Sequence, residues 1–218
     1  MTLANTIAFA QQHYSSNIAV GVKAGATLSQ SMFSPGLDQT FIMGYTGGVS
    51  FRYIEEKHFG IIAELNLQQR GWKETFDQTS YSFQRQLTYL QIPLLAHIYF
   101  GSNTAKFFFN AGPEIGFLVG DKTKANFDIT DLNNLPDDFP IENRNTEQYT
   151  MAIKNKIDYG ISAGLGMEFV ALKKHSIVME GRFYYGLNNI FSDHKKDVFA
   201  ASNGMSILVT LGYMFRIK

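Results

Sequence analysis

The stretch "DYGISAGLGMEF", residues 158–169, alternates strictly between two kinds of side chain. One series is apolar, and the other holds three glycines, a serine and two acids; the apolar series is Tyr159, Ile161, Ala163, Leu165, Met167 and Phe169. A period of two residues predicts a β-strand with two different faces. Glycine is a poor strand former, so its use on one face needs a reason, and that reason depends on which face meets water.

The same alternation recurs in seven other segments, at 19–27, 45–53, 59–68, 90–100, 108–119, 176–187 and 205–215. The connections between the eight predicted strands are alternately long and short along the chain. The long ones are 27–43, 71–86, 120–155 and 189–203, and the short ones are 54–58, 101–105 and 171–175. This alternation of long and short connections predicts an all-β fold, namely an eight-stranded antiparallel up-and-down transmembrane β-barrel with short periplasmic turns and long extracellular loops.

Composition narrows the class of protein further. The chain has 218 residues, 14% of them aromatic and only 17% charged, so it fits one domain with a weakly charged surface. Lys plus Arg and Asp plus Glu number 19 each, which gives no reason to expect nucleic-acid binding. Cysteine is absent, which excludes disulfides and thiolate sites. No stretch reaches the roughly 18 uninterrupted apolar residues of a spanning helix.

Two barrel architectures share this strand pattern. A soluble, lipocalin-like barrel turns its apolar face inward around a ligand, whereas a membrane barrel turns it outward to lipid. The polar face here is mostly Gly, Ser and Asn, too poorly charged for a soluble exterior. We therefore expect the apolar face to meet lipid at Val49, Phe51, Leu65, Ile92, Leu94, Ile115, Phe117, Ile161, Leu165, Phe183, Val209 and Leu211.

The glycine-rich face then lines a narrow lumen, where large inward residues must alternate with small ones. The inward ions are four cations and four acids, which predicts a paired charge network of Lys23, Arg52, Glu64, Glu114, Glu168, Glu180, Arg182 and Arg216. Outward aromatic residues near the strand ends are typical of interfacial girdles, namely Tyr45, Tyr53, Phe59, Phe107, Phe169, Tyr185 and Phe215.

Two prolines conflict with a closed barrel, because Pro93 and Pro113 each lack a ladder donor. Both should fall at about the same height on adjacent strands, so we expect the missing hydrogen bonds to cluster in one local irregularity, such as a bulge.

The N-terminus carries Ala8-Phe9-Ala10 before Gln11, the small-x-small pattern of a signal-peptidase site, although a basic region and a full apolar run are missing. We interpret residues 1–10 as a residual export signal, 11–17 as a periplasmic lead-in and 18–218 as the barrel domain. An N-terminal extension that carries the motif by chance is the alternative.

No constellation of residues predicts catalysis, a metal site or a cofactor. The five histidines lack metal-ligand spacing. Ser192, Asp193 and His194 are adjacent in sequence, but adjacency is not the geometry of a catalytic triad, and a solvated loop explains them better.

Several motifs together resemble one family. They are "GVKAG" at 21–25, "YLQIPLL" at 89–95, "NAGPEIGFLV" at 110–119, "DYGISAGLGMEF" at 158–169, "RFYYGLNNI" at 182–190 and "LGYMF" at 211–215. In this order they resemble the PorT-like outer-membrane β-barrels of Bacteroidota-type bacteria. The resemblance implies an outer-membrane location and, for some relatives, a link to protein secretion. It implies no catalytic residues. The chain departs from the pattern in its short signal sequence and in the three residues after Phe215.

The function that fits best is a small non-enzymatic outer-membrane barrel with a packed polar lumen, either structural or an accessory of a secretion or surface-assembly complex. Its partners would be outer-membrane lipid and other cell-envelope or secretion proteins. One alternative is a narrow pore for small solutes. A second is a lipid-modifying barrel enzyme that uses Ser192, Asp193 or His194. A soluble ligand-binding barrel comes last.

Overall fold

The computed structural model describes residues 16–76, 79–131, 136, 139–140, 145–191 and 198–218. Long strands dominate this part of the chain, with one short 3-10 helix in the longest connection. The elements are β1 (Asn17–Ser34), β2 (Gln39–Thr40), β3 (Ile42–Ile54), β4 (Phe59–Glu74), β5 (Phe83–Gly101), β6 (Ala105–Ala125), η1 (Glu147–Tyr149), β7 (Ile157–Ala171), β8 (His175–Asn189) and β9 (Ala201–Arg216).

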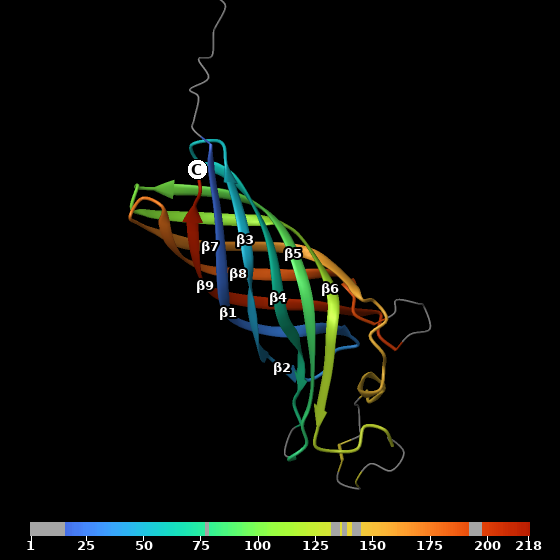
Figure 1. The fold of residues 1–218 in the computed structure, drawn as a ribbon. Coiled ribbons are helices and arrows are strands. Elements are labelled where there is room, and N and C mark those ends of the chain that lie inside the picture. Colours follow the sequence, from blue (N-terminus) through green and yellow to red (C-terminus); the bar gives the residue numbers. More distant parts are fainter. Residues whose placement is uncertain (1–15, 77–78, 132–135, 137–138, 141–144, 192–197) are drawn as a thin grey trace, which may run out of the picture.

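The long strands close into a barrel (Figure 1). Each pairs antiparallel with the long strand before and after it, β1 also pairs with β9, and β4 pairs with β5, so the ring has no gap. The two-residue β2 lies outside the ring and pairs only with the end of β4. The predicted fold, an eight-stranded antiparallel up-and-down barrel, is therefore confirmed for the described residues. Among the same residues, no helix has the length and apolar character needed to cross a membrane.

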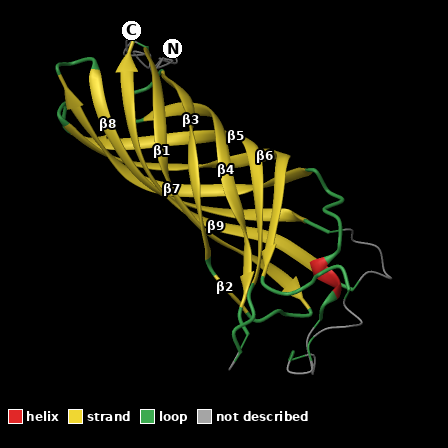
Figure 2. Cartoon of the chain, turned by 60° about the horizontal axis from the view of Figure 1, so that its bottom comes forward, coloured by secondary structure: helices red, strands yellow, loops and turns green. Residues whose placement is uncertain are grey.

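The two ends of the barrel differ (Figure 2). The start of β1, the end of β9 and the three short turns share one end, and the long connections share the other. The tight turn between β7 and β8 uses left-handed backbone at Leu172 (φ 50°) and Lys173 (φ 64°), and Gly101 (φ 131°) serves the turn between β5 and β6. The strand direction and the short turns therefore place both chain ends together, as an even number of strands requires.

The strands extend further toward the long-loop end than the alternation predicted. The expected loops 27–43, 71–86, 120–155 and 189–203 contain strand residues at 27–34, 71–74, 83–86, 120–125 and 201–203. The physical reason is that the outward side chains of most of these segments are polar, such as Lys73, Gln84 and Lys124, and those of 27–34 are mixed, so the hydrophobic alternation fades. Backbone pairing continues regardless, because the ladder does not depend on side-chain polarity.

The predicted irregularity is present as a gap in the ladders. On the β6 side, pairing stops after Pro93 opposite Glu114 and resumes at Ala96 opposite Ala111 in the same register. On the β4 side, pairing is likewise interrupted between Ala63 opposite Leu94 and Asn66 opposite Gln91. The missing pairs therefore cluster at the prolines as expected, but the suggested bulge is wrong, because the register does not change there. The register shift between β5 and β6 occurs at Thr88/Tyr89, nearer the long-loop end. The observed shift begins where β6 leaves its pairing with β7.

The core of the molecule is the barrel interior, closed at each end by an apolar cluster. At the short-turn end the cluster is small and consists of Ile54, Tyr99 and Phe108. At the long-loop end it is much larger and mainly aromatic, and it includes Phe33, Trp72, Phe76, Phe83, Tyr89, Phe139, Tyr149, Phe191 and Phe199. Between the two clusters the interior is polar, and the side chains there form the candidate site.

Candidate functional site

Four ionic side chains meet in the middle of the lumen. Arg182 on β8 donates two hydrogen bonds to Glu64 on β4, from Nη1 to Oε2 at 2.8 Å and from Nη2 to Oε1 at 3.0 Å. The same guanidinium lies 2.8 Å from Glu180 Oε2. Lys23 on β1 donates to Glu64 Oε2 at 2.6 Å and lies 3.9 Å from Glu180. Two cations and two acids thus neutralise one another away from water, which limits the cost of burying them.

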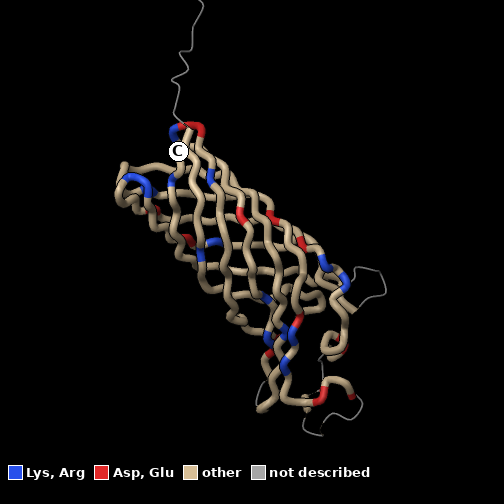
Figure 3. The backbone as a smooth tube through the Cα atoms, in the orientation of Figure 1, with Lys and Arg blue, Asp and Glu red and all other residues tan. Residues whose placement is uncertain are grey.

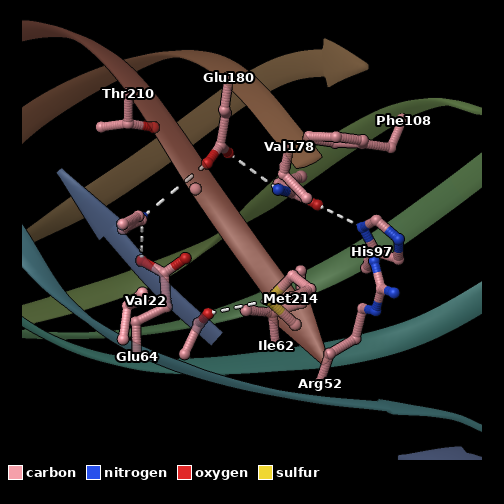
Figure 4. A pocket seen from close by; sticks show the side chains of 14 residues that line it. Val22, Arg52, Ile62, Glu64, His97, Phe108, Val178, Glu180, Thr210 and Met214 are labelled. Carbon is pink, nitrogen blue, oxygen red and sulfur yellow. Dashed lines mark hydrogen bonds and ion pairs between the residues drawn. The ribbon is translucent and has the colours of Figure 1, made fainter. Parts of the chain in front are cut away.

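Amides and a histidine extend this cluster toward the short-turn end (Figure 4). Asn110 donates its Nδ2 to Glu180 Oε1 at 2.8 Å, so its Oδ1 faces His97 Nδ1 at 2.7 Å. Since an amide oxygen only accepts, His97 donates from Nδ1, which fixes its tautomer when neutral. Asn66 donates to Glu64 at 2.9 Å on the other side. The polar network therefore crosses the lumen from β4 to β8, β6 and β5.

A separate ion pair lies next to the short-turn end. Arg52 on β3 binds Glu168 on β7 through both guanidinium nitrogens, at 2.8 and 2.9 Å, and both side chains are buried. His97 stacks on Tyr99, with ring centroids 5.4 Å apart, and its ring packs at a tilt against that of Phe108, with centroids 5.3 Å apart. Because Tyr99 and Phe108 belong to the apolar cluster at this end, the ion pair and the rings together fill the short-turn end of the lumen.

The half of the lumen toward the long loops contains a further buried pair, which the alternation did not predict. Arg70 on β4 forms an ion pair with Asp158 on β7, and Tyr184 donates its hydroxyl to the same carboxylate. The guanidinium of Arg70 lies between two rings, 4.1 Å from the centroid of Tyr89 and 4.5 Å from that of Tyr184. Arg70 could have been found, because it follows Glu64, Asn66 and Gln68 on the inward face, but the strand was predicted to end before it.

The predicted ions do not all join the network. Glu114 accepts a hydrogen bond from Ser162 and no cation pairs with it directly in the described part of the chain. With its amide nitrogen toward Glu114 (3.0 Å), Gln91 accepts from Arg70 at 2.9 Å and links the two halves. Arg216 is half-buried at the last position of β9 and has no ion pair with a described residue. It lies at the rim, where water can solvate a cation, so it needs no partner.

The glycines of residues 158–169 make room for this network. A Cβ atom built at Gly164 would lie 3.0 Å from Glu180 Oε1, and one at Gly160 would lie 2.7 Å from the ring of Tyr184. One at Gly166 would meet the ring of Phe108. The small face of β7 therefore lies against the charged and aromatic side chains of its neighbours, which is the reason for glycine in an otherwise regular strand.

The opposite faces of the strands carry the predicted lipid-facing residues. All twelve are exposed, with exposed fractions from 40% at Phe117 to 69% at Leu165, and they form the outer wall. Tyr45, Phe59, Phe107 and Phe169 are exposed on the same wall, while Tyr53, Tyr185 and Phe215 are half-buried. Charged residues lie mostly at the two ends and at a few positions along the strands, as the backbone view shows (Figure 3).

The described parts of the long connections and the strand ends that they join form a cap over the long-loop end of the lumen. Gln148 and Tyr149 of η1 donate to the two carboxylate oxygens of Glu74, both at 2.9 Å. Arg85 on β5 binds Asp121 on β6, at 2.9 Å from Nε and 2.6 Å from Nη2. These polar contacts surround the large aromatic cluster, in which Phe33 packs edge-on against Trp72 at 5.3 Å. The cap is therefore a packed structure and closes the lumen from outside.

The enclosed space that remains is small. A cavity of about 40 Å³ lies among Lys23, Arg52, Glu64, His97 and Glu180. It can hold a few water molecules. No group of three or more potential metal ligands occurs among the described residues. The triad candidates Ser192, Asp193 and His194 lie outside the described residues, as do residues 1–15 with the predicted export signal.

Comparison with models of known protein families identifies the family of this chain. The family described as outer membrane protein beta-barrel domain matches residues 9–192. The chain belongs to this family. The barrel is thus an outer membrane protein of Gram-negative type, and its apolar wall sits in the lipid of that membrane. No curated protein shows significant sequence similarity to it.

The chain is similar to several solved structures. The outer membrane protein OprG from Pseudomonas aeruginosa matches with a TM-score of 0.52 and 10% identity, over 91% of this chain and 95% of that one. Neisserial surface protein A matches with a TM-score of 0.49 and 13% identity, over 93% and 99% of the two chains. Ail, the attachment invasion locus protein of Yersinia pestis, matches with a TM-score of 0.46 and 10% identity, over 93% and 100%. At these identities the likeness concerns the fold alone.

Proposed function

We propose that this outer membrane barrel is a closed, non-enzymatic protein that acts through its extracellular cap, as an accessory of a secretion or surface-assembly complex. The observation that carries the proposal is the filled lumen. Ion pairs, amides and rings occupy it from Arg52 and Tyr99 at one end to Trp72 and Phe191 at the other. A barrel that transmits nothing through its centre must act through its outer surfaces.

A narrow pore is the alternative that this packing argues against. Solute passage would require separating Arg182 from Glu64 and Arg70 from Asp158, and would leave buried charges without partners. Breaking one such pair typically costs about 3–5 kcal/mol. The aromatic cluster would also have to unpack. The cavity of about 40 Å³ among these side chains has room for no more than a few water molecules.

The non-enzymatic part of the proposal is supported by how the lumen acids are used. Glu64, Glu168, Glu180 and Asp158 each bind a cation, and Glu114 is held by hydrogen bonds from Ser162 and Gln91, so each of these acids is already engaged and poorly placed to act as a general base. The competing idea, a lipid-modifying enzyme, depends on His194. A His194→Ala variant with the wild-type rate of lipid turnover, or a purified wild-type barrel without such turnover, would exclude it.

Conductance and cross-linking test the proposal together. We expect planar bilayers that contain the purified barrel to show no conductance above the bare bilayer. Cross-linking in intact membranes, followed by purification, should recover the barrel with other envelope or secretion proteins. Stable single-channel steps would overturn the closed barrel, and recovery of the barrel alone would overturn the role in a complex.

A further inference from the structure

One edge of the sheet is open above the barrel wall. The ladder between β6 and β7 ends at Phe117, which is opposite Ile157, and the Leu118 N–H then donates to Lys156 O at 2.7 Å. β6 nevertheless continues to Ala125, paired only with β5. Figure 1 shows the ends of β4, β5 and β6 projecting together past the rest of the wall. Residues 119–125 thus form a free edge, roughly 20 Å long.

The backbone of this edge has unused hydrogen-bonding groups. Asn126 N–H points toward the neighbouring segment and donates to Ser82 O at 3.3 Å. Because successive residues of a strand point their N–H groups to opposite sides, those of Asp121, Thr123 and Ala125 point away from β5. Among the described residues, no backbone group accepts from them. Residues 30–34 of β1 also continue beyond the pairing with β3 and pair only with β9, but there the Gln39 side chain bonds to the main chain of Ser31. An unpaired strand edge of this kind is open to pairing with another chain.

The opposite edge of the same projecting sheet is covered. β2 pairs with the end of β4, with Gln39 opposite Glu74 and Thr40 opposite Lys73. The Gln39 side chain fastens β2 to the main chain of Ser31, accepting from its N–H and donating to its carbonyl. One side of the sheet is therefore protected against pairing with other chains, while the β6 side is not.

The charge of the solvent face indicates what could pair there. Lys73, Gln84 and Lys124 lie in one row across β4, β5 and β6, and Lys122 lies opposite Gln86 on the same face. Asp121, an acid of the edge itself, lies on the opposite face of β6 from Lys122 and Lys124 and is bound by Arg85. The face beside the free edge is therefore positive. Two copies of this chain would bring their lysines together, which disfavours self-pairing.

We propose that residues 119–125 of β6 bind an extended acidic segment of a partner protein as an added β-strand. Main-chain hydrogen bonds would supply affinity, and the lysines would select acidic side chains. The inference deepens the proposed function. It rests on that function in one respect, namely that the partner is a protein at the cell surface.

A proline substitution tests the edge without changing its charge. Thr123→Pro removes one outward N–H and no bond to β5, whereas Thr123→Val keeps that N–H. The probe is a fluorescent peptide in which Glu alternates with Val and which is as long as the edge. Its fluorescence anisotropy is measured as the whole barrel, in detergent, is added. We expect Thr123→Pro to weaken binding about fivefold or more and Thr123→Val to bind like the wild type. Lys122→Glu with Lys124→Glu should also weaken binding.

Hydrogen exchange on the wild-type chain gives a second readout that does not depend on a variant folding. The amides of 121, 123 and 125 should exchange more slowly with the peptide bound. Equal binding by Thr123→Pro, equal binding of a Lys-Val peptide, or unchanged exchange would overturn the proposal. Binding of vesicles with anionic phosphate headgroups that depends on the lysines, without peptide binding, would overturn it in favour of a lipid surface. If the barrel shows no conductance and is recovered with envelope or secretion proteins but does not bind the peptide, this inference fails and the proposed function is retained.

Discussion

Arg52 and Glu168 form a buried pair whose energetic role can be isolated, because both terminal guanidinium nitrogens bind the Glu168 carboxylate, while Glu64 and Glu180 bind a different cation, Arg182. Arg52→Met leaves Glu168 charged and unpaired, so we expect the free energy of unfolding to fall by about 3–5 kcal/mol. Adding Glu168→Met should restore most of that loss, since the apolar pair needs no desolvation. Urea titrations of the refolded barrel in lipid vesicles measure both effects. Additive losses in the double variant would contradict a mutual pairing.

At the scale of the strands, alternation was sufficient to predict the eight strands, their order and their outward faces. It could not predict where the strands end, because beyond the lipid both faces of a segment such as 27–34 are polar or mixed while pairing continues. The pair between Arg70 and Asp158 was missed for the same reason, since Arg70 lies past the predicted strand end. Which acid meets which cation depends on the stagger of the strands, and no local pattern encodes that stagger.

Two glycines on adjacent strands test whether the inner face of β7 is as crowded as the packing indicates. A methyl group at Gly160 would meet the ring of Tyr184 and a backbone carbonyl, whereas at Gly181 on β8 nothing lies within 4 Å. We expect Gly160→Ala to cost about 1–3 kcal/mol of unfolding free energy and Gly181→Ala to stay within about 0.5 kcal/mol of the wild type. The urea midpoints of the two variants check this. Similar midpoints would show that the lumen can expand around the methyl group.

At the scale of the whole molecule, orientation decides whether the cap can meet a partner outside the cell. The chain has no cysteine, so one introduced thiol reports one position. Lys124 lies on the free edge of the cap and Lys173 in the short turn between β7 and β8, and both are exposed. In intact cells a membrane-impermeant maleimide should label Lys124→Cys and not Lys173→Cys, because short turns of such barrels face the periplasm. After lysis both should react. If only Lys173→Cys were labelled in intact cells, the barrel would have the opposite orientation. The β6 edge would then lie in the periplasm, out of reach of any surface protein.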